Sequence, residues 1–417
     1  MHIALLITNF EGGGAQRVVL NLAQEWKNRD HQVTIFTLET LEEYHLPQNL
    51  RIVSLSSLSG YSSKLQKALL FPILPFRLAK NVRQREISLC ISHLERADFI
   101  NILGRFLSKH RAITVIHSHL KRNYVQEGVS FRSWIYQKLV VLLTRKADHI
   151  VAVSHGIKQG LLEIGFTQKQ VSVIYNPFYP QYYFSQAKSP LPQVYQSLYK
   201  KNTILISIGR LSKQKGFWHS LKAFAQIKKN YPHLKYVILG DGYLREWLIQ
   251  YSRTLGLSVY SVWEDTEYSE SFDVYFLGFQ DNPQAFLSRS FLNILPSHYE
   301  GLPNIIIESF LCQTPVIASD CDSGPRELLA PHTDYTQKTS TFEIASHGIL
   351  TSVGNSDYTQ DMVSELTDHQ KHLIQAIEVL ISDKDLYHQY IIKSKERQTI
   401  VYPEIIMDQW NLLLEKD

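Results

Sequence analysis

The stretch Ser297-His-Tyr-Glu-Gly-Leu-Pro-Asn-Ile-Ile-Ile-Glu308 follows the short apolar run Leu292–Leu295, a pattern that predicts a strand, a loop and then a helix. Gly301 permits a tight backbone turn, and Pro303 suits the first helical position because its missing N–H needs no partner there. The free amides of a first helical turn, with about half a positive charge, attract phosphate. We therefore predict a phosphate-binding helix start at this place.

Two carboxylates flank this predicted helix start. Glu300 precedes the helix, and Glu308 lies a turn or so inside it. Carboxylates are poor ligands for phosphate, but they accept hydrogen bonds from sugar hydroxyls. A phosphate-binding segment between two hydroxyl acceptors is what a nucleotide sugar requires.

Short apolar runs alternate with helical patterns along the chain. The strands predicted in the first half are Ile3–Thr8, Gln32–Leu38, Ile52–Leu55, Leu89–Ser92, Ala112–His117, His149–Val153 and Val171–Tyr175. Those predicted in the second half are Ile204–Ile208, Tyr236–Leu239, Val274–Leu277, Leu292–Leu295 and Pro315–Ala318. Strands separated by helices form parallel sheets with right-handed crossovers. We therefore predict an α/β protein with two doubly wound, Rossmann-like domains.

A chain of 417 residues suits two domains. The proline-rich stretch between Pro177 and Asn202 marks the boundary. We predict a first domain of residues 1–185, a second of residues 186–399, and a C-terminal helix at about 400–417 that crosses back onto the first domain. Since open parallel sheets bind ligands at the carboxyl ends of their strands, we expect the ligand in an inter-domain cleft.

Charge is unevenly distributed along the chain. Residues 1–180 contain 22 Lys and Arg but 12 Asp and Glu, whereas the remainder contains 21 and 27. A basic half indicates an anionic partner. The absence of zinc-finger, RNA-recognition and basic-zipper patterns argues against nucleic acid. The segment Lys64–Arg85 is apolar, aromatic and basic, and it predicts either peripheral contact with an anionic membrane or an ordinary amphipathic helix packed on the sheet.

The three cysteines, Cys90, Cys312 and Cys321, lack paired metal-ligand spacing and are expected to be reduced and structural. The chain opens directly on a strand, without the basic start of a signal peptide. No run reaches the roughly 18 apolar residues that span a bilayer. We predict a cytoplasmic location, with the inner face of the cytoplasmic membrane as the candidate contact.

A glycine-rich turn, Glu11-Gly-Gly13-Gly14-Ala-Gln-Arg17, links the first strand to the first helix. Such a turn lets a phosphate or a sugar approach the backbone, and the alternative is a tight turn alone. The dinucleotide fingerprint G-x-G-x-x-G fails because Arg17 stands where its third glycine belongs, which argues against a dehydrogenase.

The second domain opens with a similar loop, Gly209-Arg210-Leu-Ser-Lys-Gln-Lys215-Gly216. Arg210 and Lys215 leave a strand end together, and two fixed cations there suit a departing pyrophosphate. Solvated surface charge is the alternative interpretation.

Three further candidates lie at predicted strand ends. His117-Ser-His119 ends one strand of the first domain, and the sequence leaves open which imidazole faces the site. Gly240-Asp241 and Gly278-Phe279 end two strands of the second domain, where they either line a base or ribose pocket or form turns.

Together, these motifs resemble family 4 of the retaining nucleotide-sugar glycosyltransferases, which have the GT-B fold. The resemblance is strongest over residues 203–330, where the family's motifs occur in order as Ile208–Gly216, Leu239–Gly242, Phe276–Pro283, Glu300-x7-Glu308 and Ser323–Glu327. The first domain matches more loosely, through Gly12–Val18, Val151–Ser154 and Asn176-Pro177. The motifs at Phe279–Pro283 and Asp322–Glu327 resemble those of bacterial members that build surface polysaccharides or lipid-linked oligosaccharides.

The resemblance implies roles for individual residues. Arg210 and Lys215 would bind the donor diphosphate, Glu308 the ribose, and Glu300 the donor sugar. The amides near Pro303, Asn304 and Ile305 would contact the β-phosphate, His117 would lie by the sugar and diphosphate, and Phe279 near the base. Gly13, Gly14, Gly209 and Gly240 complete the predicted donor-binding set. The family acts without metal, so we expect neither metal nor cofactor, only a nucleotide sugar, most commonly a UDP-sugar.

Two alternatives remain open at this point. One is a nucleotide-sugar epimerase or a phosphorylase of the same fold, and the other is a non-catalytic nucleotide-binding module. The acidic stretch Trp263–Glu270 is longer than the family's usual link and predicts either a surface hairpin or a partner contact. The sequence does not identify the sugar, the acceptor, the linkage or the oligomeric state.

Overall fold

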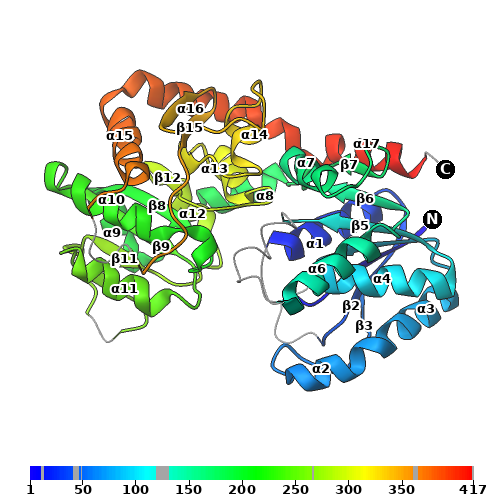
Figure 1. The fold of residues 1–417 in the computed structure, drawn as a ribbon. Coiled ribbons are helices and arrows are strands. Elements are labelled where there is room, and N and C mark those ends of the chain that lie inside the picture. The colour runs from blue at the N-terminus through cyan, green and yellow to red at the C-terminus, as the bar shows by residue number, and fades with distance from the viewer. Residues whose placement is uncertain are drawn as a thin grey trace. The chain divides into compact units, whose positions relative to one another are not determined.

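The computed structural model describes residues 1–10, 14–40, 47, 49–118, 131–264, 267–359 and 365–415. The chain divides into two compact units, one of residues 1–178 and 401–417 and the other of residues 179–400 (Figure 1). Among the helices in the described ranges, none combines the length and the apolar character that crossing a bilayer requires.

The first unit is built on a parallel sheet with the strand order β3-β2-β1-β4-β5-β6-β7. Its strands are β1 (His2–Ile7), β2 (Gln32–Thr37), β3 (Arg51–Ser54), β4 (Leu89–His93), β5 (Arg111–Ile116), β6 (His149–Ala152) and β7 (Val171–Val173). Its helices are α1 (Gly14–Asn28), α2 (Lys64–Leu70), α3 (Leu74–Gln84), α4 (Glu95–Ser108), α6 (Phe131–Thr144), α7 (His155–Glu163) and α17 (Pro403–Leu414), with the 3-10 helix η1 (Phe71–Ile73) between α2 and α3.

The second unit has the strand order β10-β11-β9-β8-β12-β13-β15-β14, with only the β14–β15 pair antiparallel among the described strands. Its strands are β8 (Thr203–Ile208), β9 (Leu234–Leu239), β10 (Val259–Ser261), β11 (Val274–Phe276), β12 (Leu292–Leu295), β13 (Val316–Ser319), β14 (Phe342–Ala345) and β15 (Gly348–Thr351). Its helices are α8 (Pro180–Lys188), α9 (Gln193–Lys201), η2 (Lys213–Lys215), α10 (Phe217–Asn230), α11 (Arg245–Thr254), α12 (Pro283–Leu287), α13 (Asn304–Cys312), α14 (Pro325–Leu329), α15 (Asp368–Ser382) and α16 (Lys384–Arg397), and η4 (Gln398–Val401) joins the two units.

The predicted α/β architecture is confirmed. Every strand predicted from an apolar run is present, with its ends within two residues of the predicted ones. The sequence prediction missed β10, β14 and β15, which are only three or four residues long. β10 and β14 lie at the two edges of the sheet and are partly exposed, so neither appears as a continuous apolar run. β15 has only two large apolar residues, Ile349 and Leu350, between Gly348 and Thr351.

The proline-rich stretch between the two sheets is not an irregular linker, because it contains α8 and α9. Pro180 occupies the first turn of α8, where proline is favoured. The last carbonyls of α8 accept hydrogen bonds from the second unit: Asn282 Nδ2 donates to Gln186 O at 3.0 Å, and Ser288 Oγ to Ala187 O at 3.0 Å. These bonds place α8 in the second unit, so the units divide at Phe178 rather than at residue 185.

The C-terminal helix α17 packs on the first unit, where Figure 1 shows it in red among blue and green elements. The ring of Trp410 meets the buried ring of Trp26 on α1 edge to face, with 5.4 Å between their centroids. Arg111 at the start of β5 donates to the carbonyl of Leu413 at 3.1 Å. The guanidinium thus satisfies a carbonyl in the last turn of the helix, where positive charge is also favoured by the helix dipole.

Candidate active site

The loops that follow β8, β9 and β11 are joined at the carboxyl edge of the second sheet. Gly209 N donates to Leu239 O at 3.0 Å, and Gly240 N donates to Gly278 O at 2.8 Å. Gly240 has φ +122°, and a Cβ there would lie 2.1 Å from Gly209 O. Only glycine fits this position, so Gly209 and Gly240 act together to bring the two loops into contact.

Lys215 and Glu300 form the central ion pair of this edge. Lys215 Nζ, on η2, lies 2.6 Å from Glu300 Oε1, and both side chains are largely buried. Ser297 Oγ donates to the same oxygen at 2.6 Å. Within the described residues Glu300 Oε2 has no hydrogen-bond partner. One oxygen therefore fixes the carboxylate, and the other is available to a ligand.

Backbone contacts hold η2 against the loop after β12. His298 N donates to Gln214 O at 2.9 Å, and Gln214 Nε2 donates to Tyr299 O at 3.0 Å. Gly216, which caps η2 with φ +61°, leaves room for Pro296 O, because a Cβ would lie 2.3 Å from that oxygen. The positions of Lys215 and Glu300 are therefore fixed by the backbone as well as by their own ion pair.

Arg210 differs from Lys215 in its surroundings. Its side chain is exposed, and no hydrogen bond or ion pair to its guanidinium occurs within the described parts of the chain. The stem of Lys215 lies over Gly209, where an added Cβ would meet Lys215 Cε at 3.3 Å. Of these two cations, Lys215 is thus fixed and Arg210 is free to meet an anion.

Helix α13 begins one residue later than its sequence predicts. Pro303 is the N-cap, with φ −73° and ψ 95°, and Asn304 is the first helical residue. The loop after β13 supports this helix start. Ser323 Oγ donates to Glu300 O at 2.8 Å, and a Cβ on Gly324 would lie 2.2 Å from Pro303 Cδ.

Glu308 lies on α13 and is half-buried. Its Oε2 accepts a hydrogen bond of 3.0 Å from Gln284 Nε2 on the short helix α12. A buried glutamine amide therefore orients this second carboxylate, as Ser297 and Lys215 orient the first.

The loops after β9 and β11 differ in what they expose. Phe279 is 76% exposed, on a loop whose Gly278 has φ +68° and packs beside Trp263. Asp241 instead accepts from Gly242 N at 2.7 Å and pairs with Arg245 at 3.2 Å. Asp241 is thus engaged in its own turn, which favours the structural interpretation of that residue, whereas Phe279 offers an open aromatic face.

In the first unit, His117 follows β5 and bonds a second histidine. Its Nε2 lies 2.9 Å from Nδ1 of the fully buried His93. Burial lowers the pKa of His117 to about 4 and that of His93 well below its usual value, so both imidazoles are neutral at pH 7. Gly14 is the first residue of α1, whereas Gly13 and His119 lie outside the described residues.

Sequence reasoning missed several residues that organise the site. Ser297 and Gln284 orient the two carboxylates, and His93 bonds His117. The chain also has two Asp-x-Asp sequences, Asp320-Cys-Asp322 and Asp383-Lys-Asp385. Asp320 is fully buried against Arg326, and the carboxylate of Asp383 caps α16 by accepting from Leu386 N at 2.9 Å. Within the described ranges no group of three His, Cys, Asp or Glu side chains is placed to hold a metal ion.

Comparison with protein families identifies the chain. Residues 12–182 match the model of Glycosyltransferase Family 4, and residues 194–337 match that of Glycosyl transferases group 1. The chain belongs to the family 4 glycosyltransferases. An uncharacterised glycosyltransferase of Methanocaldococcus jannaschii is 28% identical over 369 residues, which cover 85% of this chain and 87% of that protein.

A Campylobacter jejuni relative is 24% identical over 396 residues, covering 95% of this glycosyltransferase and 94% of the relative. It is named N-acetylgalactosamine-N,N'-diacetylbacillosaminyl-diphospho-undecaprenol 4-alpha-N-acetylgalactosaminyltransferase. Among solved structures, Anabaena HepE in complex with UDP and glucose superposes with a TM-score of 0.71 at 19% identity, covering 100% of this chain and 99% of that one. This likeness confirms the GT-B fold.

The buried histidines of this glycosyltransferase predict a stability that depends on pH. Burial lowers the pKa values of His110, His117 and His369 to about 4, against about 6.5 in the unfolded chain. The unfolded state then binds more protons between these values, so their contribution is present above pH 6.5 and is lost as the pH falls toward 4. Urea unfolding at about pH 7, 6 and 5 should give a falling free energy, and equal values would contradict this prediction.

Proposed function

We propose that this glycosyltransferase moves a hexose or an N-acetylhexosamine from a UDP-sugar to a hydroxyl of a glycan or lipid-linked acceptor, with retention of configuration. The observation that carries the proposal is the buried Lys215–Glu300 pair at 2.6 Å, beside the exposed Arg210 and the start of α13. This ion pair places two groups at the same sheet edge: a cation that can stabilise a diphosphate leaving group and a carboxylate that can accept hydrogen bonds from sugar hydroxyls.

The donor would be bound by the second unit, in the following arrangement. Arg210, Lys215 and the amides around Asn304 would hold the diphosphate. Glu308 would accept hydrogen bonds from the ribose, and the free Oε2 of Glu300 would accept one from the sugar. The exposed ring of Phe279 would lie against the base.

The proposed reaction breaks the bond between the anomeric carbon and the β-phosphate oxygen, and the electron pair leaves with the diphosphate. Arg210 and Lys215 stabilise that developing charge. The acceptor oxygen bonds to the anomeric carbon from the same face, and its proton passes to the departing phosphate oxygen. Glu300 positions the sugar and is not a nucleophile in this scheme. His117 of the first unit, neutral at pH 7, would lie by the sugar and diphosphate.

The proposed acceptor class is supported by the Campylobacter relative, whose name specifies an alpha linkage and a diphospho-undecaprenol acceptor. An α-linked product formed from an α-configured nucleotide sugar is the result of retention. We assign acceptor binding to the first unit, because residues 1–180 contain 22 Lys and Arg against 12 Asp and Glu, whereas the rest of the chain is net negative.

A screen of nucleotide sugars tests the donor assignment. Each would be incubated with the protein, and nucleotide release measured with and without a lipid-linked glycan acceptor. UDP-sugars should raise the unfolding temperature and release UDP faster with the acceptor present. Epimerisation of the donor without an acceptor would favour the epimerase alternative, and tight binding without any transfer would favour a binding module.

The segment Lys64–Arg85 supports peripheral membrane contact. Leu74, Leu78 and Val82 on α3 pack into the core of the first unit. Leu65 on α2 and Phe76 on α3 are exposed. The segment thus consists of α2, η1 and α3 rather than one helix. α3 packs its apolar residues into the core, and the segment also exposes apolar side chains.

Phosphatidylglycerol vesicles should therefore sediment the protein, and salt should weaken this binding because it screens the basic side chains. The measurement is the protein fraction that cosediments at low and at physiological salt. Phosphatidylcholine vesicles are the control, and equal binding to both lipids would contradict the proposed contact.

A further inference from the structure

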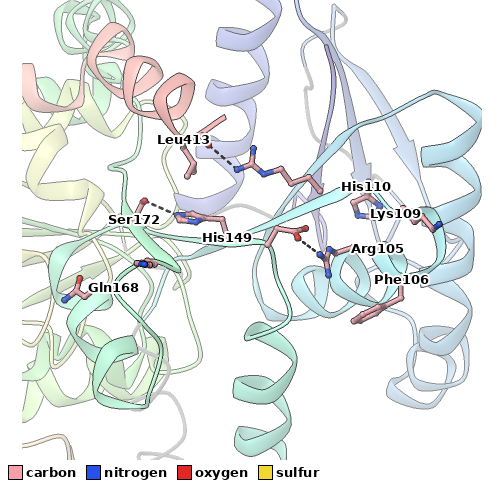
Figure 2. A pocket seen from close by; sticks show the side chains of 11 residues that line it. Arg105, Phe106, Lys109, His110, His149, Gln168, Ser172 and Leu413 are labelled. Carbon is pink, nitrogen blue, oxygen red and sulfur yellow. Dashed lines mark hydrogen bonds and ion pairs between the residues drawn. The ribbon is translucent and has the colours of Figure 1, made fainter. Parts of the chain in front are cut away.

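A pocket of about 970 Å³ opens at the amino-terminal edge of the first sheet (Figure 2). Arg111 and His149, which line it, are the first residues of β5 and β6. The carboxyl ends of these strands, where His117 follows β5, lie at the opposite edge of the sheet. The pocket is therefore separate from the strand ends where the first unit would meet a sugar.

Four cations and a single carboxylate line this pocket. The cations are Arg105, Lys109, Arg111 and Lys169, and the carboxylate is Asp148. The Asp148 carboxylate is already engaged, since it pairs with Arg105 and accepts from Ala112 N at 2.8 Å. The pocket consequently has a large excess of positive charge.

Two of the cations are fixed, and two are free. Arg105 is held by Asp148, and Arg111 by the carbonyl of Leu413 at 3.1 Å. Lys109 and Lys169 are exposed, and neither ammonium has a partner within the part of the chain that the structure describes. They come from different segments, the C-cap of α4 and the loop before β7, so an anion that meets both must lie in the pocket.

The two histidines that line the pocket bond uncharged partners. His149 Nε2 lies 2.9 Å from Ser172 Oγ, and a dashed line joins the two side chains in Figure 2. His110 is buried and bonds Asn101 Oδ1 at 2.9 Å, and its pKa is lowered to about 4. The fixed positive charges that would recognise an anion in this pocket are therefore those of its lysine and arginine side chains.

Exposed apolar side chains adjoin the pocket on α3 and α4. Phe106 lines its rim and is 59% exposed. The next residue, Leu107, lines a second pocket of about 260 Å³ together with Phe76 and the basic Lys80 and Arg83. A basic pocket for an anion thus lies directly beside apolar side chains that have no cover within the described chain.

We propose that the basic pocket binds the phosphate headgroup of an anionic phospholipid, while Phe106 and Phe76 enter the boundary between headgroups and acyl chains. Charge complementarity assigns the phosphate, and the adjoining aromatic side chains assign its lipid source, because a free phosphate needs no apolar rim. The inference rests on the proposed membrane contact and extends it from α2 and α3 to a defined headgroup site.

The test compares Lys109→Gln/Lys169→Gln with the wild type in sedimentation with phosphatidylcholine vesicles that contain phosphatidylglycerol. Binding should weaken about thirtyfold, since each basic residue near an anionic surface contributes roughly fivefold. The matched control Lys229→Gln/Lys384→Gln removes the same charge from exposed positions of the second unit and should bind like the wild type. If both double variants lost vesicle binding equally, the net charge of the protein would explain the binding, and the proposed site would be wrong.

A second arm distinguishes the source of the phosphate. Inorganic phosphate should compete with the vesicles, and Phe106→Ser should weaken vesicle binding without changing the affinity for phosphate. If the lysine double variant lost phosphate binding but bound vesicles normally, the pocket would serve a free phosphate and the lipid assignment would be wrong. UDP release with a water-soluble acceptor should be unchanged in these variants, which separates failure of this inference from failure of the proposed reaction.

Discussion

Lys215→Ala should lower the turnover of sugar transfer by about 10²–10³-fold while the second unit remains folded. Lys215 Nζ is held 2.6 Å from Glu300 Oε1 and comes from the loop that also presents Arg210. A fixed cation at the leaving diphosphate stabilises charge that develops only in the transition state, so its removal lowers kcat more than it raises KM. The measurement is UDP release under saturating donor, with circular dichroism to verify folding.

Lys213→Ala is the matched control for this variant. Lys213 lies on the same 3-10 helix and carries the same charge, but its ammonium stands over the Tyr358 ring at 5.0 Å. We expect its turnover to remain within a few-fold of the wild type. Near-normal turnover of Lys215→Ala, or an equal loss in both variants, would contradict the role assigned to Lys215.

Glu300→Gln tests the other half of the pair. Glutamine keeps the size of the side chain but removes the negative charge that pairs with Lys215 and accepts a hydrogen bond from Ser297. Turnover should therefore again fall by orders of magnitude. Because the residues act as a unit, the double variant Lys215→Ala/Glu300→Gln should lose little more than the worse single variant. Multiplicative losses would mean that the two residues act independently.

The predictable part of the fold follows from burial. Strands of a parallel sheet are covered on both faces, so they appear as continuous apolar runs, and the whole of β4 is buried. That signal placed the strands of both sheets. The signal fails for β14, a short and partly exposed strand that pairs antiparallel at the edge of the sheet. It also fails for the proline-rich stretch, where Pro180 begins a helix instead of breaking one.

The site was predictable as a set of motifs but not as a set of contacts. Spacing and strand ends identify Arg210, Lys215 and Glu300, yet the direct pairing of Lys215 with Glu300 joins residues 85 positions apart. Such a contact depends on which strands are neighbours and on how their loops fold, and a periodic pattern contains neither. Ser297 escaped notice for the same reason, since a buried serine has no distinctive sequence signal.

The basic pocket shows the same limit more strongly. Lys109 and Lys169 belong to no motif, and their segments meet only because β5, β6 and β7 are adjacent in the first sheet. The excess of positive charge in residues 1–180 was visible in the composition, but composition does not locate it.

Asp320→Ala should destabilise the second unit by about 3–5 kcal/mol, because it leaves the charge of Arg326 buried without its main partner. The carboxylate of Asp320 is fully buried, and Arg326 Nη2 lies 2.6 Å from its Oδ2. Arg326 then keeps one carboxylate, the more exposed Glu343 at 2.7 Å, and the neutral hydroxyl of Thr333 at 3.3 Å. For a unit of this size the loss corresponds to roughly 6–20 °C in the unfolding temperature, measured by circular dichroism.

The substitution also tests how the active-site loop is supported. Asp320 begins the loop whose Ser323 donates to Glu300 O at 2.8 Å. Turnover of the variant should therefore be reduced even at temperatures at which the variant is fully folded. Lys371→Ala, which breaks an exposed ion pair in the same unit, is the control and should change stability by about 0.5 kcal/mol or less.

The physical cause is tested by a second substitution in the Asp320→Ala background. If the penalty comes from an uncompensated buried charge, Asp320→Ala/Arg326→Met should be more stable than Asp320→Ala alone, because the charge has been removed. If the penalty came instead from lost packing, the second substitution would add to the loss. A double variant less stable than Asp320→Ala would therefore refute the electrostatic explanation while leaving the anchoring of the loop in place.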